Sequence, residues 1–275
     1  MTELPPSRTG ANRRSAIPSR LLTAMNKGEA ESITLVEWLA IDQGKVAQAV
    51  LPQIGFSEDE TAAVVAGHKD IRNAGIMLKT RTMAASIHRI LAARPTNQRE
   101  PLWERVAGWP GSDVVREWGA LAVTEDIGLS MERRWELARR FAVDSNMNVR
   151  EIAWLSLRPY TMSDLQEAIR LFKPWAIDEH EGMRRCAIEG TRPRGVWCFH
   201  HPVLKKDPSP ALALLDKVKS DPSRYVRNAV GNWLNDASKS RPDWVRALCS
   251  AWKTMSPTPE TAYIVKRGLR TLKKT

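Results

Sequence analysis

Three segments of the 275-residue chain share one pattern: DSNMNVREIA (144–153), DEHEGMRRCA (178–187) and DPSRYVRNAV (221–230). Each places an aspartate six residues before an arginine, with an apolar residue close ahead of the arginine. A weaker copy, SDVVREWGA (112–120), contains Val115–Arg116, and Ile264–Arg267 forms a degenerate copy downstream. The successive arginines 116, 150, 184 and 227 are separated by 34, 34 and 43 residues. Self-similarity at a period of roughly 20 to 50 residues is the signature of repeat architectures.

The sequence around these copies has the period of helices. MERRWELARRFAV (131–143) and MSDLQEAIRLFKPWAI (162–177) carry apolar residues at i, i+3, i+4 and i+7, and no segment alternates with period two. We expect each copy to end one helix, turn, and begin the next. Expected N-caps are Ser163, Ser220 and Asp221, and expected turn residues are Pro159, Pro174, Pro193, Pro208 and Pro222.

The Asp-x5-Arg spacing resembles the HEAT repeat, in which the aspartate of one turn and the arginine of a second helix form a ladder between neighbouring units. One helical hairpin cannot bury its apolar face alone, so the units stack. The resemblance predicts an all-α fold, an α-α superhelix or solenoid of HEAT-like repeats with a concave basic groove. We expect a single repeat domain over residues 18–275 after a flexible tail over residues 1–17, which are polar and contain prolines.

The charge of the chain is unevenly placed. Residues 1–180 carry 23 basic and 23 acidic side chains, whereas residues 181–275 carry 19 and 8, so the net charge of +11 lies in the last third. Such asymmetry favours a surface that binds polyanions. The alternative is a solvated basic surface that aids solubility.

The sequence does not predict a membrane span, a metal site or a disulfide bond. No apolar run reaches the eighteen or so residues of a membrane span, and the three cysteines (Cys186, Cys198, Cys249) form no CxxC pair. We expect no membrane association, no metal, no cofactor and no disulfide. The interpretation is a reducing cytoplasm, where thiols are normally kept reduced.

Four stretches between residue 150 and residue 274 resemble one family. They are LSLRPY (155–160), EGTRPRGVW (189–197), HPVLKKDPSPALALLDKVKSDPSRYVRNAVGNWLNDASKSRPDWV (201–245) and YIVKRGLRTLKK (263–274). They are similar to the DNA alkylation repair family of HEAT-like repeat DNA glycosylases, in its AlkC branch. The resemblance implies a monomer that cups double-stranded DNA and removes alkylated bases, the N3- or N7-alkylated purines.

The resemblance also implies which residues act. Glu189 and Asp236 fall on the functional carboxylates of the family, and Trp197 falls on its aromatic contact. Four arginines would face DNA: Arg158, Arg185, Arg192 and Arg194. Trp154 stands where the family has a glutamate, so it is a further candidate for DNA contact, and Glu151, one turn earlier, could supply the missing carboxylate.

Other roles remain open for these residues and for the chain. Asp236 could cap or bridge a helix end, and Glu189 could be an ion-pair partner of Arg185. The chain could be a non-catalytic DNA-binding or damage-sensing protein, or a scaffold for protein interactions.

Most tryptophans are expected in the core, since Trp38, Trp103, Trp118 and Trp135 recur with aliphatic residues at helical spacing.

Overall fold

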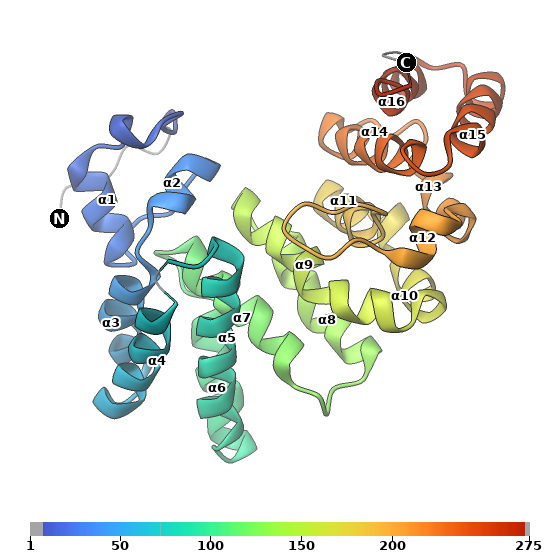
Figure 1. Cartoon of the computed structure of the whole chain (residues 1–275). Coiled ribbons are helices and arrows are strands. Elements are labelled where there is room, and N and C mark those ends of the chain that lie inside the picture. The colour runs from blue at the N-terminus through green and yellow to red at the C-terminus, as the bar shows by residue number, and fades with distance from the viewer. Residues whose placement is uncertain (1–7, 72, 273–275) are drawn as a thin grey trace. The chain divides into compact units, whose positions relative to one another are not determined.

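The computed structural model describes residues 8–71 and 73–272, which contain helices and turns but no strand (Figure 1). Two compact units are present. The first comprises residues up to Gly128 together with Ser145–Ile152, and the second comprises Leu129–Asp144 together with the chain from Ala153 onward. The predicted single domain over residues 18–275 stays a prediction.

The first unit consists of helices that pack on their sequence neighbours. α3 contacts α4, α4 contacts α5, and α7 contacts both α5 and α6. Its helices are η1 (Arg14–Ala16), α1 (Ser19–Asn26), α2 (Leu35–Ala40), α3 (Gln43–Ile54), α4 (Glu58–Asp70), α5 (Ile76–Ala92), α6 (Thr96–Ala107), α7 (Asp113–Glu125) and the start of α9 (Met147–Ser163).

The second unit carries the motifs that resemble the repair family. Its other helices are α8 (Met131–Ala142), the rest of α9, α10 (Leu165–Phe172), η2 (Trp175–Ile177), α11 (Glu181–Gly190), α12 (Pro202–Lys206), η3 (Ser209–Ala211), α13 (Leu212–Leu215), α14 (Arg224–Ser238), α15 (Pro242–Met255) and α16 (Pro259–Gly268). α11 packs on α14 and α14 packs on α16, so second helices of successive repeats lie side by side. The predicted all-α fold of HEAT-like repeats is confirmed.

The recurring aspartates and arginines form the predicted ladder. Arg184 donates two hydrogen bonds to the carboxylate of Asp221 in the next repeat, from Nε at 2.6 Å and from Nη2 at 2.9 Å. The same guanidinium donates to the backbone carbonyls of Asp178 and Glu179, both at 2.9 Å. Arg184 therefore caps its own turn and binds the turn of the following repeat, while Arg150 and Arg227 also donate to carbonyls of the turns that precede them.

Three local predictions around the turns were wrong. Pro159 lies inside α9, because the helix loses one hydrogen bond there but keeps a buried face that includes Leu157. The N-cap of α10 is Asp164 and not Ser163, since the Asp164 side chain accepts from the Glu167 N–H at 3.0 Å. The N-cap of α14 is Ser223 and neither Ser220 nor Asp221, because the Ser223 side chain accepts from the Tyr225 N–H at 3.1 Å.

The tryptophans expected in the core are largely there. Trp118 is fully buried, Trp38 and Trp135 are nearly so, and Trp103 is half-buried with its indole N–H donating to the Gly119 carbonyl. In the first unit, the indole of Trp103 thus joins α6 to α7 by a hydrogen bond.

The predicted flexible tail over residues 1–17 lies partly outside the described residues, which begin at Arg8. Arg8 donates to Glu37 of α2 at 2.6 Å, and the Ala11 N–H donates to the same carboxylate at 2.9 Å. The boundary at residue 17 stays a prediction. No helix in the described part of the chain has the length and apolarity needed to cross a membrane.

Candidate functional site

Arg192 brings together the two carboxylates that the sequence singles out. Its Nη1 donates to Oε2 of Glu189 at 2.9 Å, and its Nε and Nη2 donate to Oδ2 of Asp236 at 3.1 and 2.5 Å. Glu189 stands near the end of α11 and Asp236 stands near the end of α14. Because these two helices pack side by side, two positions distant in sequence meet at one arginine.

Glu189 is the more enclosed of the two carboxylates. Its side chain is 1% exposed, and Arg185, one turn earlier on α11, lies 3.4 Å from Oε1. Arg185 also donates to the Tyr225 carbonyl at 3.0 Å and lies over the Tyr225 ring. Arg185 is therefore a half-buried residue that joins α11 to α14.

Asp236 has basic neighbours on several sides. Lys239, one turn later on α14, donates to Oδ1 at 3.0 Å. Arg270, which follows α16, lies close enough to feel the charge of Asp236. Burial and the charge of Arg267 lower the pKa of Arg270, the charge of Arg192 lowers it further, and the charge of Asp236 opposes this shift. The carboxylate is thus the centre of a basic cluster, here defined as Arg192, Lys239 and Arg270.

The charge state of Arg192 is fixed by its partners. Burial opposes its charge, but the carboxylates of Glu189 and Asp236 outweigh burial and raise the pKa of its guanidinium. Arg192 therefore stays protonated at every physiological pH.

Arg158 is buried rather than turned to solvent, and its expected contact with DNA stays a prediction without geometric support. It is 2% exposed, and its guanidinium donates to the backbone carbonyls of Gly190, Arg192 and Phe199 at 2.9, 2.7 and 3.2 Å. Burial lowers the pKa of this guanidinium. Its contacts show that Arg158 fastens both ends of the segment after α11 to α9.

Trp154 is also buried, with 3% of its surface exposed. Its ring lies under Gly195, 3.9 Å from the position that a Cβ of residue 195 would take. In this structure Trp154 supports a loop from beneath, and a direct contact with DNA stays a prediction without geometric support. Glu151, half-buried on α9, belongs to the first unit, and its suggested compensating role stays a prediction.

Trp197 lies in the loop between α11 and α12, residues 191–201, which we call the prong loop. Among the described residues Trp197 is the one non-glycine with positive φ, 68°, and its side chain is 49% exposed. Val196 and Phe199 of the same loop are 57% and 85% exposed. The sequence interpretation included Trp197 but missed Phe199, although the run VWCF between basic residues was a visible signal.

The surroundings of the prong loop are basic. Arg194 donates to the Ser240 hydroxyl at 2.7 Å and remains half-buried. Burial lowers the pKa of His200, and the positive charges of Lys205 and Arg194 lower it further. An exposed aromatic loop thus lies in a positive local field.

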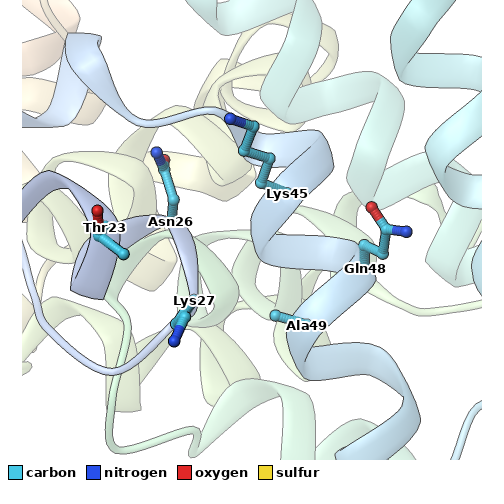
Figure 2. Close-up of a pocket in the computed structure, with 6 residues that line it drawn as sticks. All are labelled: Thr23, Asn26, Lys27, Lys45, Gln48 and Ala49. Carbon is cyan, nitrogen blue, oxygen red and sulfur yellow. The ribbon is translucent and has the colours of Figure 1, made fainter.

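Other features of the described residues carry no catalytic pattern. No cluster of three or more His, Cys, Asp or Glu side chains is placed to hold a metal ion in the described part of the chain. A shallow pocket of about 360 Å³ lies between α1 and α3 of the first unit. Figure 2 shows residues of its lining, among them Lys27, which follows α1, and Lys45 of α3.

Comparison with known proteins identifies the family. A family model described as DNA alkylation repair enzyme matches residues 120–259, which is just over half of the chain. The uncharacterized protein YhaZ of Bacillus subtilis (strain 168) is 40% identical over 119 residues, covering 43% of this chain and 33% of YhaZ.

Solved structures agree with this match. The alkylpurine DNA glycosylase AlkC of Pseudomonas fluorescens, bound to DNA containing an abasic site analog, aligns with a TM-score of 0.69 and 25% identity over 83% of this chain and 62% of AlkC. AlkD2 of Streptococcus mutans shares the fold, with a TM-score of 0.58 and 21% identity over 77% of this chain and 98% of AlkD2. The chain spans a third of YhaZ and less than two thirds of AlkC. Because the family model covers more than half of its length, the protein belongs to the DNA alkylation repair enzyme family.

Proposed function

We propose that this protein binds double-stranded DNA and hydrolyses the N-glycosidic bond of N3- or N7-alkylated purines. The observation that carries the proposal is the convergence of Glu189 and Asp236 on Arg192, beside a loop that exposes Trp197. Support also comes from the DNA-bound AlkC, which shares the fold over most of this chain.

The chemistry suits a carboxylate site. An alkylated purine is cationic, so the bond from the sugar C1′ to the base breaks with its electron pair moving to the base, which leaves neutral. Water then forms the new bond to C1′ and loses a proton to a carboxylate, for which Asp236 is the candidate. The negative charge of Asp236 and Glu189 stabilises the developing sugar cation, and the face of Trp197 can hold that cation by a π contact.

Arg192 sets a condition on this mechanism. In the free protein it occupies both carboxylates, so its guanidinium has to turn from Asp236 before a sugar can approach. A DNA phosphate is a competing partner for an arginine, because guanidinium and phosphate form strong paired hydrogen bonds. Binding of the DNA backbone and exposure of the carboxylate are therefore coupled in the proposed site.

The decisive measurement is release of free alkylated base from alkylated duplex DNA. Asp236→Asn should abolish release while duplex affinity changes little, and Asp243→Asn, an exposed carboxylate in α15, is the matched control. Absence of release by the wild-type protein, with DNA binding intact, would remove the enzyme assignment.

A second candidate is a non-catalytic member that binds or senses damaged DNA. It is favoured by Trp154, which is buried where the family has a glutamate, and by the pairing of Asp236 with Arg192. This candidate predicts unchanged affinity in Asp236→Asn and no base release from either protein.

Binding itself is tested by salt titration. If about five phosphates are engaged, log affinity should fall against log salt with a slope of roughly −4.5. Absence of salt-dependent duplex binding would exclude both DNA functions and leave a protein scaffold. We further propose a monomer acting in the cytoplasm at the nucleoid, which light scattering and localisation of a fluorescent fusion would check.

A further inference from the structure

We propose that the prong loop inserts Phe199 into duplex DNA as an apolar wedge next to the carboxylate pair. The inference rests on the DNA binding proposed above and adds the way in which the duplex is opened. The loop leaves the end of α11 and returns at the start of α12 (Figure 1).

Exposure of apolar surface is the first argument. Phe199 is 85% exposed, and Val196 and Trp197 of the same short loop are about half exposed. Single exposed apolar residues are ordinary, but three large ones gathered in four positions mark a surface that meets a partner.

The second argument is that the loop is closed at its base. The His201 N–H donates to the Pro193 carbonyl at 3.0 Å, and Arg158 donates to the carbonyls of Arg192 and Phe199 from below. The ring of His201 is buried and bonds the Thr161 carbonyl at 3.2 Å. A loop held in this way loses little conformational entropy on binding, which is what an inserting element requires.

The third argument is strain at the tip. Trp197 has φ of 68°, a region that side chains disfavour. Strain of this kind persists only where the surrounding contacts impose it, and it is concentrated at functional positions. The turn directs the segment so that Val196, Trp197 and Phe199 stay in solvent rather than folding onto the helices.

The charge around the loop selects the partner. Arg194 and Lys205 place the loop in a positive field, as their effect on His200 shows. Residues 181–275 hold 19 basic and 8 acidic side chains. An aromatic tip surrounded by basic residues fits a polyanion whose interior is apolar, and stacked base pairs between phosphates provide that combination.

Insertion of a side chain such as Phe between base steps unstacks the bases and kinks the duplex by about 20 to 90°. A kink beside the lesion widens the approach to the sugar. The proposed site gains access to C1′ in this way, with Phe199 acting on the neighbouring step and the carboxylates acting on the sugar.

The test uses a duplex with 2-aminopurine next to a tetrahydrofuran abasic analogue, with donor and acceptor dyes at the two ends. On binding of the full-length wild-type protein, 2-aminopurine emission should rise as the step unstacks, and energy transfer should increase as the duplex bends. Phe199→Ala should lose both signals and bind roughly tenfold more weakly, with the salt slope unchanged. Phe199→Leu should keep part of the signals.

Met255→Ala is the matched control, because Met255 is 62% exposed at the end of α15, away from the prong loop in sequence. It should behave as wild type. Circular dichroism and Tm check that each variant is folded. Because the Phe199 side chain is exposed, Phe199→Ala should change neither the spectrum nor the Tm.

Each outcome separates the wedge from the proposed function. If Phe199→Ala gives the wild-type emission and bend, the wedge is wrong while DNA binding stands. If emission rises but a parallel assay on alkylated duplex shows no base release, the wedge stands and the glycosylase does not. If the wild-type protein does not bind the duplex, both proposals fail.

Two other partners would also overturn the inference. Binding to phosphatidylserine vesicles that depends on Phe199, without duplex binding, would assign the loop to a lipid surface. A dimer of wild type that Phe199→Ala converts to a monomer, again without an emission change on DNA, would assign it to a second copy of the chain.

Discussion

Arg192 and Asp236 are joined by two hydrogen bonds to a single carboxylate oxygen, from Nε at 3.1 Å and from Nη2 at 2.5 Å. The same guanidinium holds Glu189. Both carboxylates are nearly fully buried, and Arg192 is the partner that they share.

Removal of Arg192 should therefore destabilise the fold strongly. Arg192→Ala leaves two buried carboxylates without their main partner, and breaking a buried pair in this way costs about 3 to 5 kcal/mol. Urea unfolding measures the loss. Arg246→Ala, at an exposed position on α15, is the control and should change the free energy of unfolding by less than about 0.5 kcal/mol. Equal losses in both variants would contradict the assigned role of Arg192.

Two ion pairs made by the repeat aspartates Asp221 and Asp178 should differ in strength because they differ in exposure. Arg184 and Asp221 have side chains 14% and 3% exposed, whereas Arg139, which pairs with Asp178 at 2.7 Å, is 55% exposed. Arg184→Ala should cost about 3 kcal/mol of unfolding free energy, and Arg139→Ala less than about 1 kcal/mol. Thermal and urea unfolding of the two variants side by side would show whether burial, and not the presence of a pair, sets the contribution.

Two substitutions of Trp197 should have the same effect on DNA binding but different effects on stability. Trp197→Ala and Trp197→Gly both remove the ring, so both should weaken duplex binding to the same degree. Glycine accepts a positive φ and alanine does not, so the glycine variant should be the more stable by about 1 kcal/mol. Affinity and Tm measured for the two variants provide the comparison, and a less stable glycine variant would contradict the strain at this position.

Arg158 should govern the order of the prong loop without contacting DNA. Arg158→Lys keeps the charge but cannot serve three carbonyls in the same planar geometry. Amide hydrogen exchange in residues 191–201 should become faster, and duplex affinity should fall with an unchanged salt slope. A shallower slope would instead mean that Arg158 contacts a phosphate.

Acid should weaken the attachment of residues 8–11 to α2. Burial alone would raise the pKa of Glu37, but hydrogen bonds from Arg8, Ile33 and Ala11 outweigh it and lower the pKa below its usual 4.5. A lowered pKa adds stability above the unfolded value, and that stability is lost as pH falls through the folded value. Glu37→Gln should thus be less stable than wild type at pH 7, with the gap closing below pH 4.5. Urea unfolding from pH 7 to pH 3 tests this, with exposed Glu136→Gln as control.

The repeating part of the fold was predictable because its signals recur. Asp178, Arg184 and Asp221 stand in a register that one copy would not have revealed, and the ladder bond between Arg184 and Asp221 follows from that register. Signals that occur once were less reliable. Pro159 indicated a turn, yet packing of the buried face of α9 keeps the helix intact through it.

The sequence suggested candidate residues for the site but not the contacts that they make. The sequence suggested that Glu189 pairs with Arg185, four positions away, and the structure adds a closer partner in Arg192, at 2.9 Å against 3.4 Å. The meeting of Asp236 with Arg192 depends on packing between α11 and α14, which spacing along the chain does not encode. Arg158 is buried whereas Arg194 is half-buried, and no local sequence pattern predicts this difference in exposure.

The bond between Pro193 and His201 has a consequence for divergence within the family. It closes residues 194–200 into an excursion whose two ends are adjacent, and the longest interval between repeat arginines, 43 residues, contains this excursion. A segment with adjacent ends can change in length and sequence while the helices on both sides keep their register. The seven residues can therefore be exchanged without a change in the helices, and a chimaera that carries such a segment from another member should fold on this framework unchanged.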